Sequence, residues 1–585
     1  MLLSRRKLFS MLLMMVVLLL LYMFTEIYLT ATNDYEVGGT AEEIAVRRSD
    51  IWEADDSAEA PRRTAFIGGK DSAFSGVVSQ WCTYGKRSLR FFGSLSDFLA
   101  ADDGGAQVLC VDPGSLSLPS DAERMRELAE RDLIVVFCAL PDAAEIENSP
   151  ELQALLGIER VRQERAALSG VYLYDGFLLG GEALYGQDTS MDVDLEIPWY
   201  QLESGTKVYL TGLTNTAEKD QGQDERPAIL WRNNEGRAKV FASNAEFLLE
   251  DETGLGLLNG ILSESSSYLL YPVVNAQNLT VAEYPSFSAE NSQELQEIYA
   301  ASHKMLLQNT VWPNLIAASE QSGFRITCYM TTQLRSPEGE PQAEDLNYYM
   351  RQLKERRSEA GRCADGGPDQ WSRDTAFLES SDDSVVFPCA YVGEDASNFL
   401  SIAQNGNAPS IRTVTGNCDS PLLSFLSEDV TYQGVTHRAD TYEFRDDLKN
   451  RSLQTALAYT NILLDMERVT WPESDEDRWE NYSRELSGNL STWWKLYSQF
   501  NKTTASEGDA RLRAFLALDY QDELDGNTID LSLQGREGTV SFLLRTHDQE
   551  VQSMTGGTAV RLEEGFWLLS VEEDAARIVL THGQP

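Results

Sequence analysis

A short apolar run near the middle of the chain, residues 269–274 (LLYPVV), constrains the fold most. It is too short and too rich in Val and Tyr for a free-standing helix, so it predicts a buried strand. Strands and helices alternate before it, and a second alternating set follows, so we expect this strand to begin a new sheet or barrel. Asn275, Gln277 and Asn278 follow at its carboxyl end. Ligands bind at that end in parallel α/β folds, so these amides are candidate functional residues.

Size, charge and cysteines limit the class of protein. The 585 residues allow about three domains of roughly 100–200 residues each. A formal net charge of −44 argues against nucleic acid or an anionic lipid surface as partner and suits a cationic polymer. A purely solubilising role for the acidic residues stays open. The seven cysteines show no CxxC and no short metal-ligand spacing, so neither a zinc knuckle nor a disulfide framework is predicted.

The amino-terminal residues predict a membrane anchor. Arg5, Arg6 and Lys7 precede residues 8–24, an apolar run broken only by Ser10. As a helix this run would span about 25 Å, close to the thickness of a thin bilayer core. No A-x-A cleavage site follows, which favours an uncleaved signal anchor over a signal peptide. We expect a single-pass protein of the cell membrane with its bulk outside the cytoplasm.

The expected fold class is α/β, with five segments. Residues 1–30 form the transmembrane signal anchor and residues 31–65 an acidic linker. Residues 66–266 form a flavodoxin-like or amidotransferase-like α/β domain, with strands at 108–112, 133–138 and 207–213 and a hairpin at Asn233–Gly236. Residues 267–517 form a barrel with a helical extension that includes a helix at 448–464. Residues 518–585 form a small antiparallel β domain.

Five strings in the second half carry a resemblance: YPVVNAQN, ITCYMTTQL, EAGRCAD, FPCAYVG and VTHRAD. Their order over residues 268–464 resembles a degenerate polysaccharide deacetylase of the NodB type. The chain is also similar to membrane-anchored proteins and PelA-like deacetylase modules of bacterial Pel exopolysaccharide operons. This resemblance implies a deacetylase-like barrel, metal-dependent removal of N-acetyl groups, and a role with exopolysaccharide.

The chain departs from that pattern where the chemistry lies. Asn275, Ala276 and Gln277 stand where the family carries its aspartates, and a carboxamide neither takes up a proton at neutral pH nor ligates a metal well. The place of the histidine pair is occupied by residues 361–365, without histidine. His437 corresponds to the late histidine that acts as an acid in the family, and Tyr391 lies in the third motif. Only four histidines occur in the chain, and no H-x-x-x-H can be built from them. We therefore expect no metal and no cofactor.

Two functions from different classes follow. The first is a non-catalytic, membrane-tethered component of exopolysaccharide synthesis or export. Its partners would be a polysaccharide, such as a cationic amino-sugar polymer, together with synthase or export proteins, and not nucleic acid. The candidate substrate contacts are Asn275, Gln277, Asn278, Asp365, Tyr391, His437 and Asp440. For the amides, a purely structural role in capping a strand end stays open.

The second function is a carbohydrate hydrolase that needs only two carboxylates about 5–10 Å apart across a groove. Two facing, partly buried acids at the barrel mouth would favour this hydrolase. Amides and solvated acids would favour the binder. A purely structural interaction protein is a third alternative. The candidate acids are Glu283, Asp365, Glu394, Asp419 and Asp440.

Overall fold

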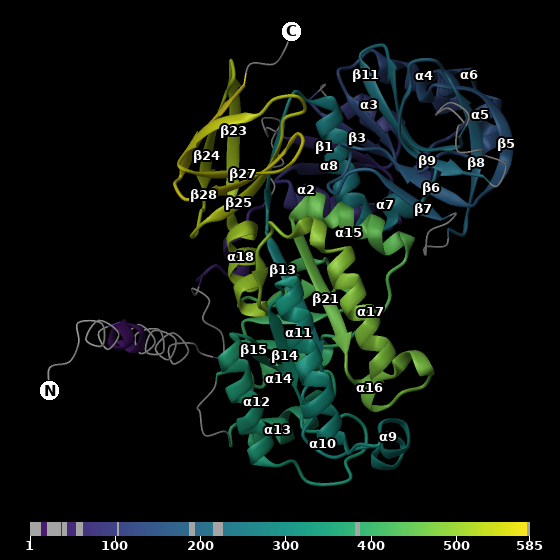
Figure 1. The fold of residues 1–585 in the computed structure, drawn as a ribbon. Coiled ribbons are helices and arrows are strands. Elements are labelled where there is room, and N and C mark those ends of the chain that lie inside the picture. The colour runs from purple at the N-terminus through teal and green to yellow at the C-terminus, as the bar shows by residue number, and fades with distance from the viewer. Residues whose placement is uncertain are drawn as a thin grey trace, which may run out of the picture.

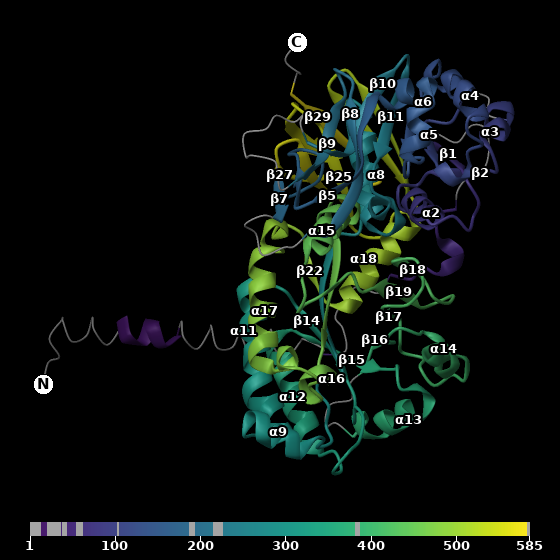
Figure 2. The same ribbon diagram turned by 90° about the vertical axis from the view of Figure 1, so that its right-hand side faces the viewer.

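The structure is a computed structural model that describes residues 13–19, 37, 44–53, 62–101, 105–186, 193–214, 226–380 and 386–581. Figures 1 and 2 show three units: an α/β unit, a curled parallel sheet with helices, and an antiparallel β unit. None of the described helices is long and apolar enough to span a bilayer. Most of the predicted anchor, residues 1–12 and 20–30, lies outside the described residues.

The α/β unit is built on a nine-stranded sheet in the order β2-β1-β3-β4-β11-β10-β9-β6-β7. Its first five strands are parallel, because short apolar strands alternate with helices that cross over between them. The remaining strands pair antiparallel, and β5 and β8 form a separate two-stranded ribbon. The predicted strands and the hairpin of this unit are confirmed. The elements are β1 Arg63–Ile67, α2 Ser75–Tyr84, β2 Ser88–Phe92, α3 Leu95–Ala101, β3 Val108–Val111, α4 Ser120–Ala129, β4 Ile134–Phe137, α5 Ala143–Glu147, α6 Pro150–Leu156, β5 Ile158–Leu168, β6 Gly170–Leu173, β7 Ala183–Gly186, β8 Leu195–Leu202, β9 Lys207–Leu213, β10 Ala228–Glu235, β11 Ala238–Ser243, α7 Phe247–Glu250 and α8 Thr253–Ser265.

The second unit is a curled sheet in the order β18-β19-β17-β16-β15-β14-β13-β21-β20, with β22 pairing beside β13. All its pairings are parallel except that of β18 with β19. The two end strands, β18 and β20, do not pair with each other among the described residues, so the sheet is a half-barrel. The elements are β13 Ala276–Ala282, α9 Ser292–Tyr299, α10 His303–Leu306, α11 Trp312–Ser322, β14 Ile326–Met330, α12 Ala343–Arg356, β15 Glu359–Cys363, α13 Gly367–Leu378, β16 Cys389–Tyr391, α14 Ser397–Gln404, β17 Thr413–Gly416, β18 Leu423–Phe425, β19 Thr431–Gly434, β20 His437–Arg438, α15 Phe444–Leu457, β21 Tyr459–Asp465, α16 Glu467–Thr470, α17 Trp479–Thr492, β22 Lys502–Thr503 and α18 Ala505–Ala517.

The third unit consists of two four-stranded antiparallel sheets, β12-β25-β28-β27 and β23-β24-β29-β26. The predicted antiparallel tail is confirmed. One strand of this unit, β12, comes from the middle of the chain. The buried side chains between the sheets include Leu270, Phe542 and Ile578. The elements are β12 Leu269–Val273, β23 Asp519–Asp525, β24 Thr528–Gln534, β25 Val540–Arg545, β26 Val551–Thr555, β27 Gly557–Glu563, β28 Phe566–Val571 and β29 Ala575–Leu580.

Two sequence predictions about the half-barrel are wrong. The central strand β12 pairs antiparallel with β25, so the half-barrel begins one strand later, at β13. The backbone turns between them at Asn275, whose φ is 55°. The predicted helix at 448–464 divides at Ala458, whose φ is 49°, into α15 and the buried strand β21. The residues after Ala458 are apolar and partly β-branched, and they pair on both sides, with β13 and β20.

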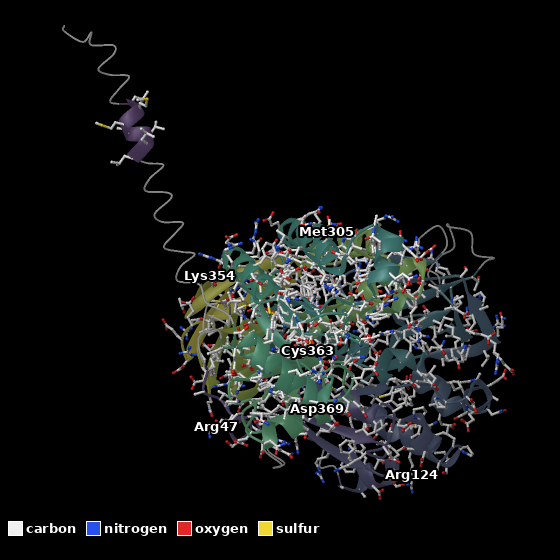
Figure 3. All side chains as sticks on the ribbon, turned by 90° about the horizontal axis from the view of Figure 1, so that it is seen from below. Arg47, Arg124, Met305, Lys354, Cys363 and Asp369 are labelled. Atoms are coloured by element: carbon white, nitrogen blue, oxygen red, sulfur yellow. The ribbon has the colours of Figure 1, made fainter. Side chains whose placement is uncertain are left out.

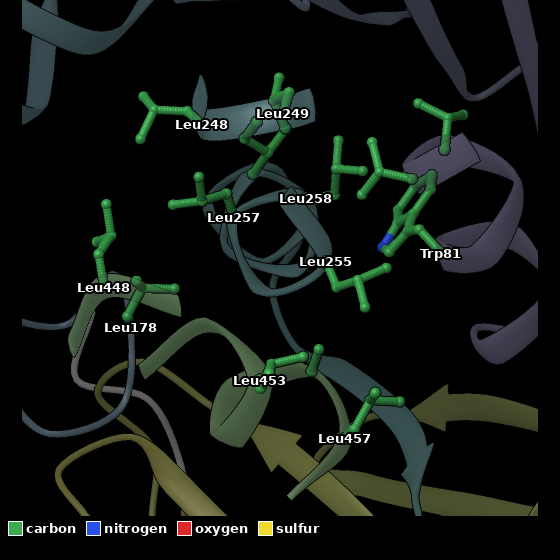
Figure 4. Close-up of a cluster of buried hydrophobic side chains, with 14 of the residues drawn as sticks. Trp81, Leu178, Leu248, Leu249, Leu255, Leu257, Leu258, Leu448, Leu453 and Leu457 are labelled. Carbon is green, nitrogen blue, oxygen red and sulfur yellow. The ribbon is translucent and has the colours of Figure 1, made fainter. Parts of the chain in front are cut away.

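A single buried cluster connects the α/β unit to the half-barrel. Figure 4 shows leucines of α8 between Trp81 of α2 and Leu453 and Leu457 of α15. The two helices approach closely at Gly256, whose backbone N–H donates to Ser452 Oγ at 2.8 Å. A Cβ added at Gly256 would lie 2.2 Å from the Ser452 carbonyl oxygen. The contact therefore requires glycine at this position.

Candidate active site

Four polar side chains stand at the carboxyl ends of neighbouring parallel strands. Glu283 directly follows β13, Asp365 follows β15, and Tyr391 and Asp465 are the last residues of β16 and β21. All four are partly buried. Burial raises the pKa of Tyr391, and the charges of Asp465, Glu283 and Asp365 add to that rise, so the four side chains lie near one another. We call these residues the mouth cluster.

The mouth cluster faces away from the other two units. Helices α9, α13 and α16 follow β13, β15 and β21, and Figure 1 shows them at the lower end of the half-barrel. In Figure 3, which views the molecule from below, Cys363 at the end of β15 lies near the middle of the half-barrel's face. Ligands of parallel α/β folds bind at this end of the strands.

Glu283 and Asp365 form a carboxyl pair. Burial raises the pKa of Glu283 to about 10, and the charges of Asp365, Asp465 and Glu467 and a hydrogen bond with Asp365 act in the same direction. Two carboxyl groups can share a hydrogen bond only when one of them carries a proton. Asp365 Oδ1 is buried without a donor among the described residues. Glu283 therefore holds the shared proton at neutral pH.

The backbone of Glu283 is also unusual. Its φ is 58°, the left-handed conformation, which costs a residue other than glycine about 1–2 kcal/mol. Strained residues of this kind concentrate at functional sites.

Asp465 and Tyr391 differ from this pair in their surroundings. Asp465 Oδ1 accepts the backbone N–H of Glu467 at 3.1 Å. Burial raises the pKa of Asp465, and the guanidinium of Arg438 opposes that shift. Burial also raises the pKa of Tyr391, with Asp465 and Glu283 adding to the effect, so its phenol keeps its proton. The mouth cluster thus combines a protonated acid, a second carboxylate near a cation, and a hydroxyl donor.

Arginines and an aromatic ring surround the cluster. Asp440 pairs with Arg438 at 3.2 Å and with Arg468, so its carboxylate is already neutralised. Arg438 Nη2 is buried without a hydrogen-bond partner among the described residues. Arg335 pairs with Glu467 and lies 5.6 Å from the centre of the Trp471 ring. Trp471 is partly exposed, whereas four aromatic residues that follow it in the chain are core residues: Trp479, Tyr482, Trp494 and Tyr497.

The three predicted amides lie at the other end of the half-barrel. Asn275, Gln277 and Asn278 stand at the amino end of β13 and are at most 1% exposed, which corrects their expected place at a carboxyl end. Each side chain is hydrogen-bonded inside the protein, so these amides hold strands and loops together at the base of the sheet. Their amide nitrogens donate to Ser541 Oγ at 3.2 Å, the Ala458 carbonyl at 2.7 Å and Gln433 Oε1 at 3.0 Å, respectively.

His437 is placed away from the cluster, in the interior beside α15. Its Nε2 donates to the Asp446 carbonyl at 3.0 Å, and its Nδ1 contacts Thr436 Oγ1 at 2.9 Å. Burial lowers its pKa to about 3, so the ring is neutral. With both ring nitrogens occupied, His437 does not have the free acid function that the resemblance implies.

The remaining expected acids separate into two groups. Glu394 and Asp419 are exposed on loops, whereas Glu283 and Asp365 meet in the mouth cluster. Asp465 was missed, because residues 448–464 predict one continuous helix. The available signal was the run YTNILLD, whose apolar strand pattern ends in a carboxylate.

The metal implied by the deacetylase resemblance does not fit this site. Among the described residues no group of three or more His, Cys, Asp or Glu side chains is arranged to hold a metal ion. His303 and His547 contact Ser286 and the carbonyls of Ser263 and Ser266 instead.

Comparisons with known proteins concern the fold. No protein-family profile and no curated protein matches the sequence. Agd3, a novel carbohydrate deacetylase, aligns with 89% of this chain and 98% of its own, at a TM-score of 0.49 and 9% identity. A candidate glycoside hydrolase/deacetylase from Parabacteroides distasonis covers 47% of this chain and 82% of its own, at a TM-score of 0.27 and 11% identity. The exo-β-1,4-mannosidase Op5Man5 from Opitutaceae bacterium strain TAV5 covers 36% of this chain and 35% of its own, at a TM-score of 0.22 and 11% identity. At these scores the similarity carries no argument about activity, so function has to be argued from the side chains.

Proposed function

We propose that this chain is a carbohydrate hydrolase that cleaves glycosidic bonds by acid catalysis at the mouth cluster. The observation that carries the proposal is the Glu283–Asp365 pair, two partly buried acids at the carboxyl ends of β13 and β15, where burial and the charge of Asp365 raise the pKa of Glu283. Such a pair keeps a carboxylic acid protonated at neutral pH, which is what a general acid requires.

In the proposed reaction Glu283 donates its proton to the glycosidic oxygen as the bond from the anomeric carbon to that oxygen breaks. In its carboxylate form Asp465 would stabilise the positive charge that develops on the sugar ring. Burial raises its pKa, and the charge of Arg438 opposes that shift and so favours the carboxylate. A water molecule then adds its hydroxyl to the anomeric carbon, and its proton restores the acid pair. Tyr391 donates a hydrogen bond from its phenol, and Trp471 offers a partly exposed ring on which a sugar can stack.

A second candidate function, binding of a cationic amino-sugar polymer without cleavage, is favoured by the formal net charge of −44. An acidic surface attracts such a polymer at long range, and added salt screens that attraction. Both functions involve a polysaccharide. In the first function the polymer is cleaved with Glu283 as the acid, and in the second it is bound without cleavage.

The decisive experiment uses the full chain and partly de-N-acetylated hexosamine oligomers. We expect the wild type to release shorter oligomers by mass spectrometry, and Glu283→Gln to slow this release by about 10²–10⁴-fold. The oligomer affinity of the variant should be unchanged, because the amide keeps the shape of the acid.

The control variant is Glu297→Gln, the same substitution at an exposed site of α9. Its rate should equal that of the wild type. Salt-sensitive binding without any cleavage by the wild type would replace the hydrolase with the binder. Unaltered cleavage by Glu283→Gln would exclude Glu283 as the acid.

We also propose that residues 8–24 anchor the chain in the cell membrane, with its bulk outside the cytoplasm, as part of a Pel-like exopolysaccharide system that includes synthase or export proteins. The basic residues before this run and its apolar length support this location. The full chain should remain in the membrane fraction after a high-salt wash, and added protease should cleave it in intact cells. Release by salt, or protection of the whole chain, would contradict the anchor or its orientation.

A further inference from the structure

A polar pocket lies far from the mouth cluster, where the α/β unit meets the antiparallel β unit. Its volume is about 560 Å³. The walls come from the amino ends of β3 and β4, from β11 and α8, and from β23 of the third unit. Its lining includes charged and phenolic side chains: Arg62, Arg87, Lys239, Tyr268, Tyr520 and Asp522.

Positive charge exceeds negative charge in this pocket, although the chain as a whole is strongly acidic. Three cations, Arg62, Arg87 and Lys239, line the pocket against two carboxylates, Asp132 and Asp522. Asp522 is already paired with Arg62 at 2.8 Å, and Asp132 is exposed at the rim. Arg87 and Lys239 thus have no carboxylate partner among the described residues.

The Arg87 guanidinium is buried and held in place by two hydrogen bonds to neutral side chains. It is 6% exposed; its Nε donates to Thr64 Oγ1 at 3.0 Å and its Nη2 to Gln107 Oε1 at 3.2 Å. Its Nη1 donates to no residue in the described part of the chain. These neutral acceptors fix the plane of the guanidinium without neutralising it. A buried cation without a counter-charge is unfavourable, and a bound anion would offset that penalty.

Lys239 and two tyrosines complete the pocket. Lys239 Nζ donates once, to the Ser265 carbonyl at 2.6 Å, which leaves two of its three N–H groups for a ligand. The Tyr268 hydroxyl donates to Asp522 at 2.8 Å, and Arg62 lies 3.8 Å from the centre of the Tyr520 ring. The polar groups of the wall are therefore preorganised by contacts within the protein.

We propose that this pocket binds a small oxyanion, a phosphate or carboxylate group on a ligand of about monosaccharide size, through Arg87 and Lys239. Guanidinium and ammonium groups in a partly desolvated pocket are the usual protein partners of such anions. The Debye length of about 8 Å at physiological salt screens the distant surface acids, so the local cations decide the interaction. Because its wall includes both units, the bound anion would also stabilise their contact.

The test measures binding of inorganic phosphate, inorganic sulfate and glucuronate to the full chain by calorimetry, alongside thermal melting. We expect one saturable site per chain and a higher melting temperature with the ligand. Lys239→Met and Arg87→Gln should each weaken binding by about tenfold or more. Tighter binding of glucuronate than of phosphate would identify an acidic sugar as the ligand, and the reverse order would identify a phosphate group.

The matched control is Arg160→Gln, which removes one positive charge from the exposed ribbon strand β5 and should leave binding unchanged. If Arg87→Gln does not fold, Lys239→Met and protection of Lys239 from amine acetylation by the anion decide instead. Absence of saturable binding of all three anions, or equal binding by the wild type and Lys239→Met, would overturn the proposal.

Discussion

At the scale of the residue, environment rather than residue type distinguishes the functional acids. The chain has 92 acidic side chains, and only position decides which of them can hold a proton at neutral pH. Glu283 does so because strand ends bring it next to Asp365 and partly remove both from water. Asp440, two residues after β20, forms ion pairs with two arginines instead.

The proton on Glu283 predicts a pH dependence of stability. Its pKa is about 10 in the folded state, against an ordinary value of 4.5. Between these values the unfolded chain releases the proton and the folded chain keeps it, so this group's stabilisation is complete below pH 4.5 and declines as pH rises. The melting temperature of the wild type should therefore fall more steeply between pH 5 and 9 than that of Glu283→Gln, whose amide does not titrate.

The melting temperature of Glu297→Gln should be measured over the same pH range, because other buried acids also titrate. That control should follow the wild type across the whole range. Parallel melting curves for Glu283→Gln and the wild type would mean that Glu283 is ionised in the folded protein, and the acid role would be lost with it.

At the scale of the element, one helix crossing connects two units. Helices α8 and α15 pack so closely at Gly256 that a methyl group there would contact the backbone of Ser452 at 2.2–2.7 Å. Backbone atoms cannot swing aside as a long side chain can. The spacing of the two helices is therefore fixed by the absence of a side chain at this residue.

Gly256→Ala should accordingly destabilise the protein, by about 1–3 kcal/mol, because the added methyl group overpacks a buried contact. Chemical denaturation followed by circular dichroism measures this change. The matched control is Gly488→Ala in α17, where an added Cβ meets nothing within 4 Å. That substitution should be neutral or stabilising, since alanine favours a helix over glycine. Equal stability of both variants would contradict the close crossing.

At the scale of the whole molecule, the three units depend on one another. The buried cluster around α8 includes side chains of the α/β unit, of α15 and of α18, such as Phe66, Leu453 and Phe515. Strand β12 leaves the α/β unit and completes a sheet of the β unit before the chain enters the half-barrel. Continuity of the core makes separate folding of the half-barrel unfavourable.

A chain shortened to residues 267–581 should therefore fail to fold properly. Removing α8 exposes Leu453 and Leu457 of α15, and the exposed apolar surface promotes association. We expect aggregates by size-exclusion chromatography and no cooperative melting, in contrast to the full chain. A monodisperse fragment that melts cooperatively would identify the half-barrel and the β unit as an independent domain.

Much of the architecture was determined by the sequence alone. Short apolar runs between amphipathic segments predict an α/β protein, because period and length of hydrophobic patterns follow from helix and strand geometry. The hairpin at Asn233–Gly236 and the antiparallel tail could be predicted from the sequence for the same reason. Glu283 and Asp365 were among the candidate acids expected at the barrel mouth, together with Glu394, Asp419 and Asp440, from which the sequence did not distinguish them.

Only the tertiary structure decided which strand belongs to which sheet. Local pattern does not encode a partner, so the strand at 269–274 was assigned to the barrel, and Asn275, Gln277 and Asn278 were assigned to the wrong end of the half-barrel. The same holds for the acids: proximity and burial raise the pKa of Glu283, and both depend on residues up to 184 positions away, such as Glu467. Chemistry at this site is thus a property of the folded chain and not of any segment of its sequence.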